Sequence, residues 1–229
     1  MQRFSMAKAL VSRARTHQNW IGDDHGDRYE DAMHAEAIPD EMQIVVKELL
    51  EHLRAALDYC AQQVWINLTG GGTLTQIYFP IAREGASPTD FLSLMNRNMP
   101  GVAAASATAV DVFKSFQQFS DDKNAWLPEL ATLVNLAKHD HLEVATIPDA
   151  LLNFSKDAQG RTLMAFQPGH APKRGYPFMM LKQISGDLEY GVYKAVFLQL
   201  KATQSELSGF IREAIAGVES IITECEKLE

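Results

Sequence analysis

Hydrophobic residues recur every three or four positions along most of this chain, which is the spacing of one face of an α-helix. The longest such pattern predicts a helix over about residues 40–68, with Asp40 as its N-cap and Gln43 as the reciprocal partner of a capping box. Glycines at 70–72 end it. The apolar face of this helix consists of Met42, Val46, Leu49, Leu53, Ala56, Leu57, Cys60 and Val64. We expect it to lie in the core.

Both ends of the chain carry the same pattern. Near the N-terminus, an amphipathic helix is predicted, with apolar positions Phe4, Ala7, Leu10, Val11 and Ala14. Over about 203–228, apolar residues step by four and three in a heptad seam of about three repeats: Leu207, Ile211, Ala214, Val218, Ile221, Cys225 and Leu228. Thr203 and Glu206 match a capping box at its start. The seam favours packing against the body of the protein, or in a homodimer, over a free coiled coil.

Shorter helices are predicted between these, over about 87–99, 102–119 and 124–138, and the pattern changes after His139. Short β-branched runs at 142–147, 151–155, 161–166, 176–183 and 190–200 predict antiparallel strands, with a further edge strand at 29–38. Because a helix follows the strands, we expect one α+β domain over residues 1–229. It has a mainly helical core (about 40–140), a small antiparallel sheet (about 141–200) and a C-terminal helix (about 203–228).

Composition narrows the function classes. The formal charge of −8 opposes general binding to DNA or RNA backbones, although a local basic site remains compatible with it. No apolar run approaches the roughly 20 residues that a membrane-spanning helix needs. Cys60 and Cys225 lie on apolar helix faces, which favours free thiols in a reducing cytoplasm over a secreted, disulfide-bonded protein.

Three polar motifs resemble cofactor or metal sites, but each has a structural interpretation that we prefer. The glycines at 70–72 lack the Lys-Ser/Thr pair and the flanking strand of a phosphate loop. The acidic run at 23–27 lacks the ligand spacing of a calcium loop and is interpreted as a solvated loop. His139 and His141 have the spacing of two zinc ligands on a strand but no third ligand at a recognisable spacing, so a polar helix-to-strand junction is the preferred interpretation.

The candidate site combines two helical segments. Arg54 and Asp58 are four residues apart and share a helix face beside the apolar stripe. Asn135, Lys138 and His139 lie together on a later helix. Arginine, lysine and histidine are the residue types that bind phosphate and transfer protons near neutral pH. The alternatives are that the same residues tie helices together, or that a small-ligand pocket is lined by Trp65, Trp126 and Tyr176.

Three motifs in this order resemble a group of uncharacterised bacterial proteins: Leu-Arg-Ala-Ala-Leu-Asp at 53–58, Phe-Pro-Ile at 79–81 and Asn-Leu-Ala-Lys-His at 135–139. Their helical core is similar to HEPN domains, many of which are RNases in toxin–antitoxin and phage-defence systems. The HEPN signature, an arginine four to six residues before a histidine, is absent before His139. Arg28 and His34 match its spacing, but we place them in the predicted edge strand and treat the match as chance.

The resemblance implies an RNA- or phage-defence-related role, including metal-independent RNA cleavage. In that case His139 is the acid/base, Arg54 and Lys138 stabilise the developing phosphate charge, and Asp58 orients Arg54. Asn135 completes the site. The rival hypothesis is a non-catalytic homodimeric scaffold, in which these residues hold the helix-to-sheet junction.

Overall fold

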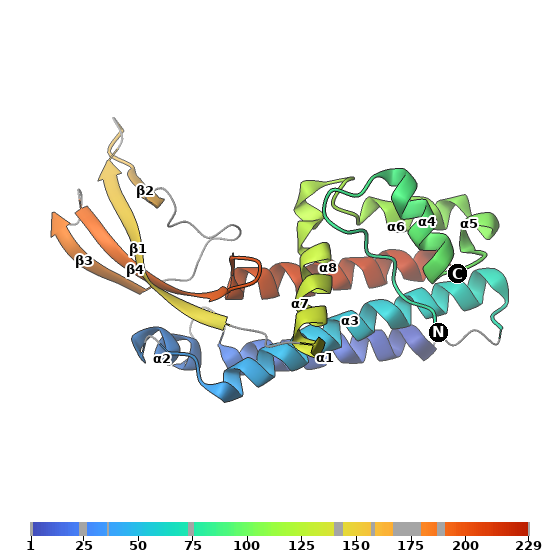
Figure 1. The fold of residues 1–229 in the computed structure, drawn as a ribbon, viewed down its shortest axis with the longest axis horizontal. Helices are drawn as coiled ribbons and strands as arrows, with labels where there is room; N and C mark the ends of the chain where they lie inside the picture. Colours follow the sequence, from blue (N-terminus) through green and yellow to red (C-terminus); the bar gives the residue numbers. More distant parts are fainter. Residues whose placement is uncertain are drawn as a thin grey trace. The chain divides into compact units, whose positions relative to one another are not determined.

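The computed structural model describes residues 2–22, 27–35, 37–72, 76–139, 144–156, 159–166, 180–186 and 191–228. The fold is α+β and mainly helical, as predicted (Figure 1). The α-helices are α1 (Gln2–Ile21), α2 (Asp27–Ala35), α3 (Asp40–Thr69), α4 (Pro88–Asn98), α5 (Val102–Ala105), α6 (Ala107–Ser115), α7 (Trp126–His139) and α8 (Leu207–Cys225). Short 3-10 helices are η1 (Asp122–Ala125) and η2 (Glu226–Leu228), and the strands are β1 (Val144–Lys156), β2 (Thr162–Phe166), β3 (Met180–Gly186), β4 (Gly191–Leu200) and β5 (Ser205–Glu206).

The chain divides into two compact units, each described separately below. The helical unit consists of Met1–His17, Lys47–His141 and Arg212–Glu229, and the strand unit of Gln18–Val46 and Leu142–Ile211. Helices α1, α3 and α8 contribute residues to both. The expectation of a single domain stays a prediction, because two compact units can fold as one cooperative domain or as two.

In the helical unit, α1, α3 and α8 run side by side and α7 crosses them (Figure 1). The apolar stripe of α3 is buried as predicted, from Leu49 to Val64. On α1, Phe4, Ala7, Val11 and Ala14 are buried. Arg3 of α1 donates to Gln62 of α3 over 2.6 Å. The helical period read from the sequence therefore identified the faces that form this core.

The heptad seam of α8 is buried within the protein. All seven of its positions are at most 7% exposed. Within the helical unit, a Cβ atom added at Gly217 would overlap the indole of Trp126, so α8 approaches α7 closely at this glycine. The seam therefore packs against the protein itself, which was the first of its two predicted uses.

The start of α8, in the strand unit, differs from the prediction. The carboxylate of Glu206 accepts hydrogen bonds from the backbone N–H groups of Ser208 at 2.8 Å and Gly209 at 2.6 Å. Glu206 is fully buried and also accepts from the Tyr29 hydroxyl. The N-cap is thus Glu206, whereas the sequence pattern placed it at Thr203. The glutamate side chain, which is longer than that of threonine, folds back here and accepts hydrogen bonds from N–H groups of the first turn, which have no partner within the helix.

The strand unit contains an antiparallel sheet in the order β2-β1-β4-β3, with β5 added to β4. The two runs predicted at 142–147 and 151–155 form one strand, β1, whose pairing with β4 shifts between Ile147 and Ala150. A β-bulge of this kind bends a strand without ending its pairing. The alternation of apolar residues is interrupted at the bulge, and for this reason the sequence pattern predicts two strands where the fold has one.

The predicted edge strand at 29–38 is wrong, because α2 occupies Asp27–Ala35. Its buried residues are Tyr29, Ala32 and Met33, at three- and four-residue spacing. This helix contacts β1, β3 and β4. Three apolar positions in nine residues fit one face of a short helix. This face is buried because α2 packs against the sheet.

Candidate functional site

The candidate site begins with an extended segment, residues 76–83, which we call the strap. Phe79 at its centre is fully buried, and its ring lies 5.2 Å from that of Phe113 on α6. The segment has no strand partner among the described residues, so its backbone polar groups need other hydrogen-bond partners in order to be buried.

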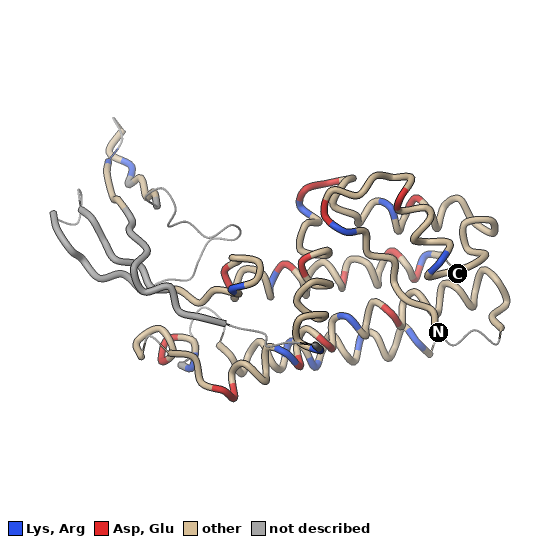
Figure 2. The backbone as a smooth tube through the Cα atoms, viewed as in Figure 1, with Lys and Arg blue, Asp and Glu red and all other residues tan. Residues whose placement is uncertain are grey.

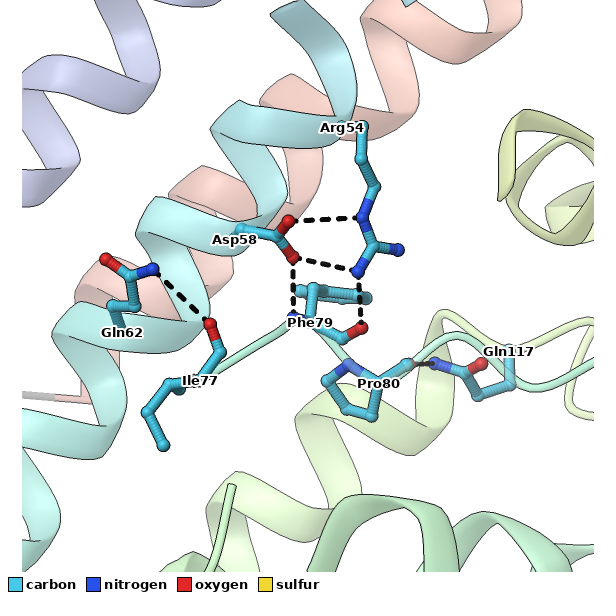
Figure 3. Close-up of polar contacts among 7 residues, drawn as sticks. All are labelled: Arg54, Asp58, Gln62, Ile77, Phe79, Pro80 and Gln117. Carbon is cyan, nitrogen blue, oxygen red and sulfur yellow. Dashed lines mark hydrogen bonds and ion pairs between the residues drawn. The ribbon is translucent and has the colours of Figure 1, made fainter. Parts of the chain in front are cut away.

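Arg54 and Asp58 of α3 supply some of these partners (Figure 3). The two side chains form a bidentate ion pair, with Nε to Oδ2 at 3.2 Å and Nη2 to Oδ1 at 2.9 Å. Asp58 Oδ1 also accepts from the Phe79 N–H at 2.9 Å, and Arg54 Nη2 donates to the Phe79 carbonyl at 3.3 Å. The pair therefore holds both backbone groups of one strap residue, an extended segment rather than the neighbouring helix that the structural alternative expected.

Two glutamines hold the strap on either side of Phe79 (Figure 3). Gln62 of α3 donates to the Ile77 carbonyl at 3.3 Å. The buried Gln117 donates to the Pro80 carbonyl at 3.1 Å and accepts from the Ala82 N–H at 2.9 Å. These side-chain amides form the hydrogen bonds with the backbone of the strap that a neighbouring strand would otherwise form.

A cavity of about 410 Å³ opens beside this pair, within the helical unit. Its polar lining consists of Arg54, Asp58, Tyr78, Arg97, Asn98, Asn135 and Lys138. Arg54 comes from α3, Arg97 from α4 and Lys138 from α7, so the cavity carries three cations and one carboxylate. The structure thus brings together four of the five predicted site residues, namely Arg54, Asp58, Asn135 and Lys138.

The cations of this cavity are available to a ligand. Arg97 and Lys138 are exposed and form no ion pair within the described part of the chain. Arg54 uses Nε and Nη2 in the contacts above, and among the described residues its Nη1 donates no hydrogen bond. In Figure 3 this third nitrogen points away from Asp58. Asp58 and Phe79 therefore fix the orientation of a guanidinium that still has free donors.

Burial and nearby groups shift the pKa of Asp58 in opposite directions. Burial raises the pKa of its carboxyl above the ordinary value, while Arg54, the Phe79 N–H and the charge of Lys138 each lower it. Asp58 and Lys138 line the same cavity. Lys and Arg are otherwise spread over several helices rather than gathered on one (Figure 2). The cationic character of the cavity is thus local.

The fifth predicted residue, His139, ends α7 directly after Lys138, and its side chain lies outside the described residues. Residues 23–26 and 140–143, which include most of the acidic run and His141, also lie outside them. Among the described residues, no group of three or more His, Cys, Asp and Glu has an arrangement that could hold a metal ion.

Several other residues that the sequence singled out serve the fold rather than a binding site. Trp65 and Trp126 are 6% and 3% exposed, and Trp65 donates to the Pro100 carbonyl, so both are core residues; Tyr176 lies outside the described residues. Gly70 and Gly71 end α3 with φ values of 75° and 73°, as a helix terminus requires.

The strand prediction was the reason for treating Arg28 and His34 as a chance match, and that reason is wrong, since both lie on α2. Six residues on a helix separate them by roughly 120° around its axis. The guanidinium of Arg28 lies 4.4 Å from the centre of the Trp20 ring and donates to the Trp20 carbonyl. The two residues therefore do not share a helix face, and Arg28 already has partners.

Sequence reasoning missed Tyr78, Arg97 and Asn98, which also line the cavity. Tyr78 is next to the Phe-Pro-Ile motif, and this position was its only sequence signal. Arg97 and Asn98 occupy the last turn of α4, where a basic residue has the general function of interacting with the helix dipole.

No helix among the described residues has the length and apolar character needed to cross a membrane. Comparison with known proteins adds no relative: no family model, no curated protein and no solved structure matches this chain. The likeness to HEPN domains accordingly stays a prediction.

Proposed function

We propose that this chain binds single-stranded RNA in the cavity between Arg54, Arg97 and Lys138. The supporting observation is the convergence of three cations from three separate helices, in a chain whose formal charge is −8. Arginine binds phosphate through paired N–H donors, and lysine binds it as a point charge. A local site of this kind is compatible with the absence of general nucleic-acid binding expected from the overall charge.

The remaining lining residues favour RNA over a simple anion. Tyr78 is 46% exposed, so its ring offers a face on which a base can stack. Asn98 and Asn135 each carry an amide that both donates and accepts, which suits a base edge or a 2′-hydroxyl. A volume of about 410 Å³ is within the usual range of small-ligand sites and suits one nucleotide unit.

Cleavage is the second part of the proposal. His139, adjacent to Lys138, takes the proton from a 2′-hydroxyl as its oxygen attacks phosphorus. The bond from phosphorus to the 5′-oxygen then breaks, which leaves a 2′,3′-cyclic phosphate, and the 5′-oxygen takes a proton from water while His139 returns its proton to water. Arg54 and Lys138 stabilise the added negative charge, and Asp58 and Phe79 keep Arg54 oriented. None of these roles needs a metal ion.

This activity fits the RNA- or phage-defence-related role that the HEPN resemblance implies, in the cytoplasm that the two free, buried cysteines favour. The rival homodimeric scaffold has less support. Its sequence basis was the acidic charge and the heptad seam, and the residues of the seam are buried within the single chain.

The experiment measures degradation of a fluorescent single-stranded RNA in EDTA by the wild type, by His139→Ala and by His34→Ala. His34 is an exposed histidine on α2 and provides the matched control. We expect cleavage by the wild type and the control and a loss of at least about 100-fold in His139→Ala, the scale of a lost general base. Equal background rates in all three would refute cleavage, and absence of RNA binding would refute the whole proposal.

A further inference from the structure

A second cavity, of about 370 Å³, adjoins the first within the helical unit. Both cavities are lined by Ile81, Leu94 and Arg97, so these three side chains form the boundary that the cavities share. The second continues along the strap and α4 to Arg83, Ser93 and Asp90. The two cavities thus follow one another along the same two elements, with Arg97 at their junction.

The second cavity, like the first, is lined by more cations than carboxylates: it has two arginines and one aspartate. Arg83 and Arg97 are exposed and form no ion pair within the described residues. Asp90 is the one carboxylate in the lining, and it is engaged at the start of α4, where it accepts from the Ser87 N–H at 2.9 Å and hydroxyl at 2.8 Å. These hydrogen bonds keep the carboxylate turned to the helix cap.

Apart from the hydroxyl of Ser93, the rest of the lining is apolar. Ile81, Ala82 and Leu94 contribute side chains without hydrogen-bonding groups, and Ala86 adds a small one. A surface of this kind accepts the face of a base or the edge of a ribose, while flanking guanidinium groups bind phosphate. Each cavity therefore combines a flat or apolar surface with cations, which is the alternation found along a single nucleic-acid strand.

We infer that the two cavities form one groove for a single strand of at least two nucleotides, in which Arg97 binds the phosphate between them and Arg83 the next one. This inference rests on the proposed RNA binding and adds its substrate class: an oligonucleotide rather than a mononucleotide or free phosphate. A ligand confined to the first cavity would leave Arg83 without a role.

The test compares binding of a nucleoside 3′,5′-bisphosphate, a dinucleotide and an octanucleotide of RNA to the wild type, Arg83→Gln and Lys123→Gln. Lys123, exposed on η1, is a control for the loss of one charge outside both cavities. We expect the octanucleotide to bind the wild type at least about 10-fold more tightly than the bisphosphate, since it occupies both cavities. Arg83→Gln should lower octanucleotide affinity by roughly 3- to 10-fold, the scale of one phosphate contact, and leave bisphosphate affinity unchanged.

Equal affinity for all three ligands, or equal octanucleotide affinity in Arg83→Gln and Lys123→Gln, would overturn the second subsite while leaving RNA binding intact. An equal loss for bisphosphate and octanucleotide in Arg83→Gln would also overturn it, because Arg83 would then act through the first cavity. If no ligand bound the wild type, the proposed function itself would fail.

Discussion

Two bidentate arginine–carboxylate pairs in the described part of the helical unit have similar bond geometry but differ in burial and in what else they bind. Arg54–Asp58 and Arg15–Glu219 have similar N–O distances, 3.2 and 2.9 Å in the first and 2.9 and 2.7 Å in the second. The side chains of the first pair are 18% exposed each, and those of the second are 50% and 42% exposed. The first pair also binds the backbone of Phe79, whereas the second joins α1 to α8 at the surface.

Each pair also lies beside a cavity. The cavity at Arg54 contains two further cations, Arg97 and Lys138, without ion-pair partners among the described residues. The cavity at Arg15, of about 310 Å³, contains one further cation, Lys8, which pairs with Glu226 at 2.6 Å. Burial and free charge, rather than the ion pair itself, therefore distinguish a candidate site from an ordinary surface contact.

The largest effect is expected from Asp58→Ala. This change leaves the Arg54 guanidinium and the Phe79 N–H without their acceptor in a half-buried position, at a cost of about 3 kcal/mol in the free energy of unfolding. Urea denaturation measures it. Asp58→Asn keeps an acceptor oxygen and should lose less; a loss below about 1 kcal/mol in Asp58→Ala would show that the strap does not depend on this pair.

The next effect concerns stacking in the first cavity. Tyr78→Ala should weaken RNA binding by about 1–3 kcal/mol, the contribution of one base–aromatic stack, with little change in the melting temperature because the ring is exposed. Fluorescence anisotropy with a short RNA gives the affinity. Tyr78→Phe keeps the ring and should bind as the wild type does. Equal affinity in the alanine variant would exclude Tyr78 from the site.

The exposed pair should matter less. Glu219→Ala removes the partner of Arg15 at the surface, where such a pair contributes about 0–1 kcal/mol to stability. Urea denaturation at low and high salt checks this, and added salt should reduce the small difference further. A loss comparable to that of Asp58→Ala would remove the distinction drawn between the two pairs.

The smallest effect is on the titration of Asp58. The charge of Lys138 lowers the pKa of this carboxyl, so Lys138→Gln should raise it, measured from carboxyl carbon chemical shifts. Because burial holds the folded pKa above the unfolded one, the folded state binds more protons between those values. Relative to Asp58→Asn, stability should therefore fall as pH rises through that interval. An unchanged pKa would place Lys138 too far away to act.

The sequence predicted the parts of this molecule that depend on local periodicity. The stripe from Met42 to Val64 repeats over many turns, and it correctly identified the buried face of α3. The helix start predicted near residue 87 is local and is confirmed, and the structure shows that Ser87 and Asp90 form a capping box there. For α2, three apolar residues were too few to decide between helix and strand, and the sheet that covers them is far away in the sequence.

The candidate site was predictable only in part for the same reason. The i, i+4 spacing of Arg54 and Asp58 is visible in the sequence, but their hydrogen bonds to Phe79 depend on where the strap folds. Arg97 and Lys138 line one cavity although 41 residues separate them (138 − 97). No local pattern encodes such a convergence, because it arises from the packing of α4 and α7 beside α3.

The most direct test of the central claim is the salt dependence of RNA affinity in two double variants. Arg97→Gln/Lys138→Gln removes two cations from the proposed site, and Lys8→Gln/Arg15→Gln removes two from the cavity at α1 and α8. We predict that the first lowers affinity at least about 10-fold and reduces the slope of log K against log salt by about 1.4, or about 0.7 for each phosphate that is no longer neutralised, and that the second changes neither. Equal slopes in both variants would contradict RNA binding at the cavity beside Arg54.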